Sequence, residues 1–270
     1  MRRTITECRP IGRANSTDGA GRVALSGEAR YDAQMAATDK LVGVIGGMGP
    51  DATIDFMAKV IDLTPARTDQ DHIRMLVEHN PHIPSRQQAM AGTGEDPGAV
   101  IASLAARLEA GGADFIVMPC NAAHAWQPDI LKAITIPFVS IVEESVVAAQ
   151  EAGDGAVGLL TTPGCFAAGV YQRALANQDA VLPTEGELAE TLAFVERVKA
   201  GDKSEAVSAG LRALANRLLS RGASTIIAAC TELPLVLDQS MFNVPFVSST
   251  DVLAIKTVKL ALGQEPLPEP

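Results

Sequence analysis

The sequence predicts an α/β fold of two Rossmann-like lobes, each with a parallel sheet flanked by helices. Two observations predict this fold class. First, short apolar runs such as LVGVIGG (41–47) and AVGLLTT (156–162) alternate with segments of helical periodicity, which is typical of parallel sheets. Second, the chain contains an internal repeat, which indicates that a second lobe follows the first and is built in the same way.

The repeat consists of three pairs of similar segments in the same order. The pairs are LAARLEAGGADFIVMPC (104–120) with LANRLLSRGASTIIAAC (214–230), VGVIGGMGP (42–50) with VGLLTTPGC (157–165), and IPFVS (136–140) with VPFVS (244–248). Their offsets are 110, 115 and 108 residues. Short matches rich in Ala and Leu arise by chance, so the common order and nearly constant offset are what favour a duplication. The first pair ends in Cys120 and Cys230.

Each expected element follows from its local pattern. A buried strand at 41–47 should end in a glycine turn, and Ile101, Leu104 and Leu108 recur at helical spacing before a glycine stop. The other expected elements are a helix at 52–63, strands at 75–80, 114–119 and 135–141, a helix through 143–153 and a strand at 156–162.

The same patterns divide the chain into a tail and two lobes. Residues 1–40 carry seven Lys and Arg against five Asp and Glu and have no periodic apolar face, so we expect a disordered tail. The N-terminal lobe is expected at 41–140 and the C-terminal lobe at 141–249. A last helix at 250–264 should pack back on the N-terminal lobe.

Composition excludes several classes of partner. A net charge of −10 and an aromatic content of 4% argue against nucleic acid and against acidic membrane surfaces. No apolar run is long enough to span a membrane, and the N-terminus lacks the apolar core of a signal peptide. The four cysteines include no CxxC pair, and no HExxH is present, so we expect free thiols in the cytoplasm and no metal site.

Cys120 and Cys230 are the candidate catalytic residues. Ligands of parallel sheets bind beyond the carboxyl ends of the strands, where both cysteines are expected, and two similar lobes would place them on opposite walls of one cleft. A following helix N-terminus would favour thiolate over thiol. A single such cysteine would more often be a buried core residue, but two at corresponding positions favour a functional pair.

Two facing thiols suit the inversion of a carbon centre. A thiolate removes the proton from one face of the carbon, and a thiol on the other face returns a proton with inverted configuration. Because the two groups exchange roles, either enantiomer can be the substrate. This chemistry needs no cofactor.

Several motifs resemble those of the aspartate/glutamate racemase family, and in particular its aspartate racemases. The resemblance covers 41 to about 258 and implies a cofactor-independent amino-acid racemase (an isomerase without pyridoxal phosphate), commonly a homodimer, acting on a small-molecule amino acid. The motifs are IGGMGPDAT (45–53), DQDHI (69–73), NPHIPSR (80–86), MPCNAAH (118–124), GLLTTPGCFAAGVY (158–171), VKAG (198–201) and CTELPL (230–235).

The resemblance also implies substrate-binding residues. Arg86 matches an arginine that holds a substrate carboxylate, and Lys199 matches a lysine that assists it. A strongly acidic protein needs such local cations to bind a dianion; without the resemblance, both would be read as ordinary surface charges. Asn121 and Thr231, next to the cysteines, offer donors to the α-carboxylate or cap helices. The remaining expected substrate-binding residues are Thr162, Gly47 and Met48.

The turn IGGMGP is not a nucleotide loop, because it lacks the lysine of GxxxxGK[ST] and the spacing of GxGxxG. Its glycines either let backbone N–H groups approach a carboxylate or allow a tight turn. His124 and Glu232 are further candidates for orienting the thiols.

Four positions depart from the family pattern. Ser85 stands where aspartate is usual, Ala122 and Cys165 where threonine is usual, and Ala229 where glycine is usual. These departures leave the substrate open between aspartate, glutamate and a wider range of amino acids. Two other classes also remain open: another thiol enzyme of the superfamily, such as a hydantoin racemase or a malonate-type decarboxylase, and a two-lobed binding protein without activity.

Overall fold

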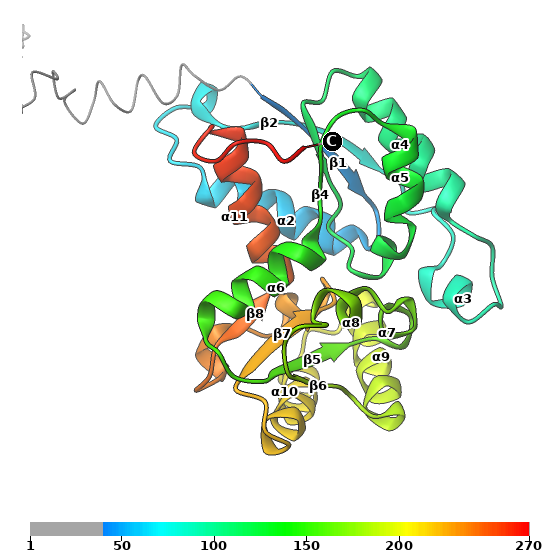
Figure 1. Cartoon of the computed structure of the whole chain (residues 1–270), viewed down its shortest axis with the longest axis vertical. Coiled ribbons are helices and arrows are strands. Elements are labelled where there is room, and N and C mark those ends of the chain that lie inside the picture. Colours follow the sequence, from blue (N-terminus) through cyan, green and yellow to red (C-terminus); the bar gives the residue numbers. More distant parts are fainter. Residues whose placement is uncertain (1–39, 270) are drawn as a thin grey trace, which may run out of the picture. The chain divides into compact units, whose positions relative to one another are not determined.

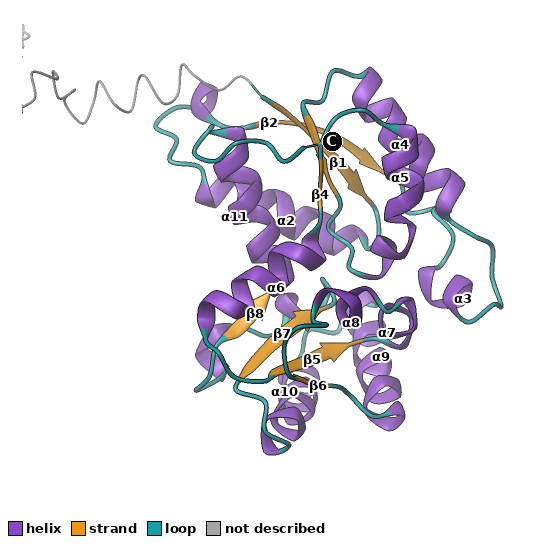
Figure 2. Cartoon of the chain, in the orientation of Figure 1, coloured by secondary structure: helices purple, strands orange, loops and turns teal. Residues whose placement is uncertain are grey.

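A computed structural model describes residues 40–269, which form two parallel four-stranded sheets flanked by helices (Figures 1 and 2). The strand orders are β2-β1-β3-β4 and β6-β5-β7-β8. The second sheet therefore repeats the order of the first, strand for strand. This confirms the predicted fold class. The tail expected at 1–40 lies outside the described residues, apart from Lys40.

The elements of the first lobe alternate as the apolar pattern predicts. Its strands are β1 (Leu41–Gly46), β2 (Arg74–His79), β3 (Phe115–Val117) and β4 (Phe138–Val139). Its helices are α2 (Pro50–Leu63), α3 (Arg86–Met90), α4 (Gly98–Ala110) and α5 (Gln127–Ala133), with the 3₁₀ helices η1 (Asp69–Asp71) and η2 (Ala122–Trp126).

The second lobe has the same plan. Its strands are β5 (Val157–Thr161), β6 (Ala180–Val181), β7 (Thr225–Ala229) and β8 (Phe246–Ser248). Its helices are α6 (Ile141–Ala152), α7 (Pro163–Ala168), α8 (Val170–Ala174), α9 (Glu185–Lys199) and α10 (Glu205–Ser220), with η3 (Leu233–Leu235) and η4 (Gln239–Met241). The last helix, α11 (Ser249–Ala261), follows β8.

Corresponding residues of the repeat fill corresponding places in the two cores. Leu104, Leu108 and Ile116 are buried in the first lobe, and the residues aligned with them in the sequence, Leu214, Leu218 and Ile226, are buried in the second. Each such side chain contributes roughly 1.5–3 kcal/mol by burial.

A glycine in each central strand lets a helix approach closely. A Cβ added at Gly43 would lie 3.2 Å from Cβ of Leu108, and one added at Gly158 would lie 3.1 Å from Cβ of Leu218. These distances are shorter than ordinary contacts between side chains, so both sheets need glycine where α4 and α10 cross them.

The last helix lies against both lobes. Helix α11 packs on α2 of the first lobe and on α6 of the second (Figure 1). Lys59 of α2 forms an ion pair of 2.8 Å with Asp251 of α11. The boundaries at 41–140 and 141–249 stay a prediction.

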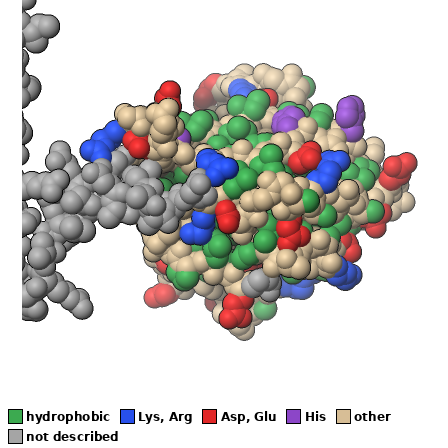
Figure 3. All heavy atoms as spheres, turned by 90° about the horizontal axis from the view of Figure 1, so that it is seen from above, with side chains coloured by type: hydrophobic (Ala, Val, Ile, Leu, Met, Phe, Trp, Pro, Cys, Tyr) green, Lys and Arg blue, Asp and Glu red, His purple; other side chains and the backbone are tan. Residues whose placement is uncertain are grey.

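The surface carries charges of both signs. On the face shown in Figure 3, acidic and basic side chains are interspersed among apolar ones. Within residues 40–269, no helix is both long enough and apolar enough to cross a membrane.

Candidate active site

Both cysteines line a single cleft. Cys120 lies three residues after β3, and Cys230 directly follows β7, so each occupies the carboxyl end of a central strand. The residues that line this cleft are Met48, Ser85, Arg86, Gln87, Cys120, Asn121, Ala122, Thr162, Cys165, Lys199, Ala229, Cys230, Thr231 and Glu232. The lining brings together the predicted catalytic and substrate-binding residues except Gly47, and it includes Glu232 but not His124.

Gly47 forms a tight turn behind the cleft. Its φ is +93°, and a Cβ added there would come within 2.4 Å of the backbone of Asn80. Its N–H donates to the Thr53 hydroxyl at 2.9 Å. Of the two roles expected for these glycines, the geometry favours the turn at this position.

The loop that carries Cys120 is held by His124. The backbone N–H of Ile141 donates to Nε2 of His124 at 3.2 Å, so the proton lies on Nδ1, which donates to the Cys120 carbonyl at 2.9 Å. Burial lowers the pKa of His124 to about 4. A neutral imidazole therefore ties the cysteine loop to the start of α6.

Cys230 is paired with a buried carboxylate. Its thiol donates to Oε2 of Glu232 at 3.0 Å, and Nζ of Lys199 lies 3.5 Å from Oε1 of the same side chain. Burial, and then the charge of Glu232, raise the pKa of the Cys230 thiol well above its ordinary value, while Lys199 opposes the shift. In this arrangement Cys230 is a thiol.

This differs from the expected effect of a helix N-terminus. Only short 3₁₀ helices follow the cysteines, five residues at η2 and three at η3. So short an element sums few peptide dipoles. At Cys230 the thiolate prediction is therefore wrong, because desolvation and Glu232 decide the direction of the shift.

Two cations lie at the cleft. Nη1 of Arg86, at the start of α3, donates to the carbonyls of Ile83 at 3.1 Å and Pro84 at 2.9 Å. A guanidinium has five N–H donors, so these bonds leave others. Lys199 ends α9, and its side chain is 42% exposed.

Gln87 joins the two lobes across the cleft, which the sequence did not predict. Its Nε2 donates to the Thr162 hydroxyl at 2.8 Å, and the N–H of Gly164 donates to its Oε1 at 2.6 Å. The cleft has a volume of about 50 Å³, room for about four water molecules.

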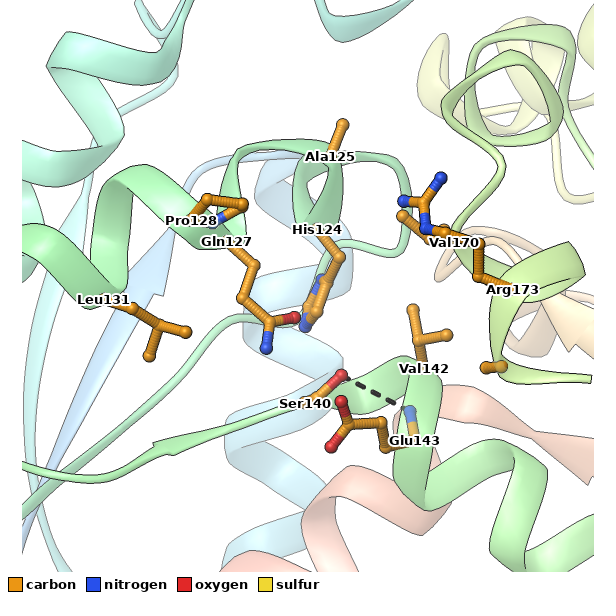
Figure 4. A pocket seen from close by; sticks show the side chains of 11 residues that line it. His124, Ala125, Gln127, Pro128, Leu131, Ser140, Val142, Glu143, Val170 and Arg173 are labelled. Atoms are coloured by element: carbon orange, nitrogen blue, oxygen red, sulfur yellow. Dashed lines mark hydrogen bonds between the residues drawn. The ribbon is translucent and has the colours of Figure 1, made fainter. Parts of the chain in front are cut away.

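A larger cavity of about 440 Å³ lies beside the Cys120 loop (Figure 4). His124 contributes to its wall, together with Gln127 from α5, Glu143 from α6 and Arg173 from α8. The hydroxyl of Ser140 accepts the N–H of Glu143 there. This cavity contains neither thiol.

Two similar α/β lobes, each with a cysteine at the end of a central strand, are the features by which this chain can be compared with known protein families. Residues 45–257 match the family model described as Asp/Glu/Hydantoin racemase. The chain belongs to this family.

Individual relatives agree with the family match. The chain is 31% identical over 230 residues to the broad specificity amino-acid racemase RacX of Bacillus subtilis, covering 83% of this chain and all of the relative. The structure resembles the aspartate racemase of Picrophilus torridus with a TM-score of 0.74 and 28% identity, over 85% of this chain and 96% of that one. A glutamate racemase from Francisella tularensis solved with D-glutamate shares the fold, with a TM-score of 0.61 and 16% identity over 84% and 82% of the two chains.

Proposed function

We propose that the protein is a cofactor-independent amino-acid racemase in which Cys120 and Cys230 are the acid–base pair. One observation carries the proposal: two cysteines at corresponding strand ends of a duplicated fold line the same cleft. The family match and the racemases among the relatives support the same reaction class.

The surroundings of the thiols suggest their starting roles. Cys230 is a thiol hydrogen-bonded to Glu232, so it is the proton donor in the first half of the reaction. Cys120 is then the base that removes the proton from Cα on the opposite face. The carbanion then takes the proton from Cys230, and the configuration inverts. Lys199 compensates the negative charge that this leaves on Cys230.

Acidic amino acids fit the cleft best. Arg86 and Lys199 supply positive charge for a second carboxylate, and a guanidinium matches a carboxylate in shape. We therefore propose aspartate or glutamate as substrate. A wider range is the second candidate, because Ala122 and Cys165 replace hydroxyls in the lining and RacX, a relative, is named as broad in specificity.

We also propose Asn121, Thr162 and Thr231 as groups near the α-carboxylate, with Met48 in contact with the substrate. A homodimer is proposed from the family resemblance, and sedimentation velocity would test it. The three described cysteines are free, which favours a reducing compartment such as the cytoplasm.

The experiment follows proton exchange and optical rotation in D₂O with each amino acid in turn. Cys120→Ala and Cys230→Ala should each abolish racemisation, because inversion needs a group on both faces. Either variant is expected to retain slow exchange of Cα–H from one enantiomer only. Cys8→Ala, which lies outside the described residues, is the control for removing a thiol. Full racemisation by either single variant contradicts the two-thiol mechanism.

A further inference from the structure

A buried chain of hydrogen bonds passes through Asn121. The Tyr171 hydroxyl, on α8, donates to Oδ1 of Asn121 at 2.6 Å. Nδ2 of Asn121 donates to the Ser249 hydroxyl at 2.9 Å, and Ser249 donates to the carbonyl of Ala228 at 2.9 Å. Tyr171 and Ser249 are fully buried, and Asn121 is 2% exposed. Each donor has one acceptor, so the orientation of the Asn121 amide is determined.

This chain connects the two thiol positions. Asn121 directly follows Cys120 in the first lobe, and Ala228 lies on β7, two residues before Cys230. Tyr171 lies on α8 of the second lobe, and Ser249 is the first residue of α11. The hydrogen bonds therefore hold the Cys120 loop against the strand that ends at Cys230.

The chain of hydrogen bonds through Asn121 occurs in one half of the sequence repeat only. Position 231, which corresponds to Asn121 in the aligned segments, is a threonine. Threonine has one hydroxyl and no amide, so it cannot bridge two partners as a donor at one atom and an acceptor at another. The Cys120 side thus has a constraint that the duplication does not explain.

Tyr171 is a constant donor in this chain. Burial raises the pKa of its hydroxyl well above 10, although a hydrogen bond with Ser145 acts in the opposite direction. The proton therefore stays on Tyr171 throughout the working pH range. Loss of the hydroxyl would leave Oδ1 of Asn121 without this donor in a buried setting, where hydrogen-bond networks are most sensitive.

We propose that Tyr171 is a positioning residue that acts through Asn121 and Ser249 to set the placement of the Cys120 thiol relative to Cys230. This inference rests on the proposed two-thiol racemisation. Tyr171 does not touch the reacting carbon in this proposal; it determines whether Cys120 and Cys230 lie on opposite faces of that carbon, so that the thiol on the far face can protonate it. A small displacement of a reacting group is enough to lower its rate by about 100-fold.

The proposal predicts a change in how the carbanion is partitioned. The carbanion accepts a proton either from the thiol on the far face, which inverts the centre, or from the original face, which restores it. In D₂O the far thiol carries deuterium, so inversion gives labelled product. The near thiol carries the proton that it has just removed, so restoration gives labelled substrate only when that proton exchanges with solvent before it returns, and a longer-lived carbanion allows more of this exchange. If the far thiol is misplaced, labelled substrate should accumulate relative to labelled product.

Tyr171→Phe tests this, because it removes only the hydroxyl. The variant should lower kcat for racemisation by about 10- to 100-fold, leave KM nearly unchanged, and raise the ratio of labelled substrate to labelled product at early times. Ser249→Ala should shift the ratio in the same direction. If both residues act through Asn121, the effect of the double variant is smaller than the product of the single effects.

Thr257→Val is the matched control. Thr257 is also fully buried on α11, and its hydroxyl donates only to the carbonyl of Leu253 within the helix, at 2.7 Å. It should leave the ratio unchanged. An unchanged ratio in Tyr171→Phe, or the same change in Thr257→Val, overturns the proposal. If Tyr171→Phe does not fold, Ser249→Ala carries the test alone. Absence of racemisation in the unaltered protein would instead contradict the proposed function.

Discussion

At the scale of single residues, burial decides the chemistry of the site more than residue type does. His124 is 3% exposed, and burial lowers its pKa to about 4, so its imidazole is neutral. Both of its ring nitrogens are engaged, with the Cys120 carbonyl and the Ile141 N–H. The structure therefore supports the orienting role expected for this residue. Glu232 was likewise only a candidate, because a buried carboxylate 3.0 Å from a thiol has no local signal in sequence.

The neutrality of His124 predicts a pH dependence of stability. Its folded pKa of about 4 lies below the ordinary histidine value of 6.5, so between these values the unfolded chain binds a proton that the folded chain does not. Stability should fall as pH decreases from 6.5 to 4, by up to about 3 kcal/mol. Urea unfolding of the protein and of His124→Gln across this range measures it.

The test compares the free energy of unfolding of the unaltered protein with that of His124→Gln at each pH, because the carboxylates titrate in both proteins and their effect cancels in the difference. His124→Gln should be less stable at pH 7 and should show a shallower loss on acidification. Parallel stability curves would contradict the assignment of a neutral buried imidazole.

At the scale of elements, the sequence predicted the strands and helices whose buried residues recur at a regular spacing. Buried runs gave the strands at β1, β3 and β5, and the spacing of Ile101, Leu104 and Leu108 gave α4. The elements that form the cleft are short and polar, and they have no such period. Helix α3 has five residues, and the turns after the cysteines are the 3₁₀ helices η2, of five residues, and η3, of three. The cysteines could be predicted to share a cleft because they occupy corresponding positions in the repeat. Gln87 lies outside the repeated segments, so its contacts across the cleft could not be predicted.

Gln87 on α3 should stabilise the closed form of the cleft. Its two hydrogen bonds to the second lobe contribute roughly 1 kcal/mol each, so Gln87→Ala should lower the ratio of closed to open molecules by about 5- to 30-fold. We expect KM to rise in the same proportion. Steady-state kinetics with both enantiomers measures this.

Gln88→Ala provides the comparison, because Gln88 is the adjacent amide of α3 and is exposed. It should leave KM unchanged. Equal KM values in Gln87→Ala and Gln88→Ala would show that the bonds across the cleft do not limit binding.

At the scale of the whole molecule, a substrate held between two lobes should stabilise the folded chain. The cleft is formed by segments from β1 to η3, and helix α11 packs on both lobes. A ligand that binds only when these segments are assembled shifts the unfolding equilibrium by mass action, by about 2.7 kcal/mol at 100 times Kd. For a folded part of this size, that corresponds to a rise in Tm of about 5–10 °C.

Binding can be separated from turnover by measuring this rise in a double variant, Cys120→Ala with Cys230→Ala. Aspartate or glutamate should raise Tm in this background, and alanine should raise it less, because alanine has no second carboxylate for Arg86 and Lys199. Adding Arg86→Ala should remove most of the rise for the acidic amino acids, since an unpaired carboxylate in a desolvated cleft is costly. Arg107→Ala is the control, because Arg107 pairs with Glu78 on the surface and lies away from the cleft lining. Equal rises with Arg86→Ala and Arg107→Ala would mean that Arg86 does not bind the second carboxylate, and the wider substrate range would then be favoured.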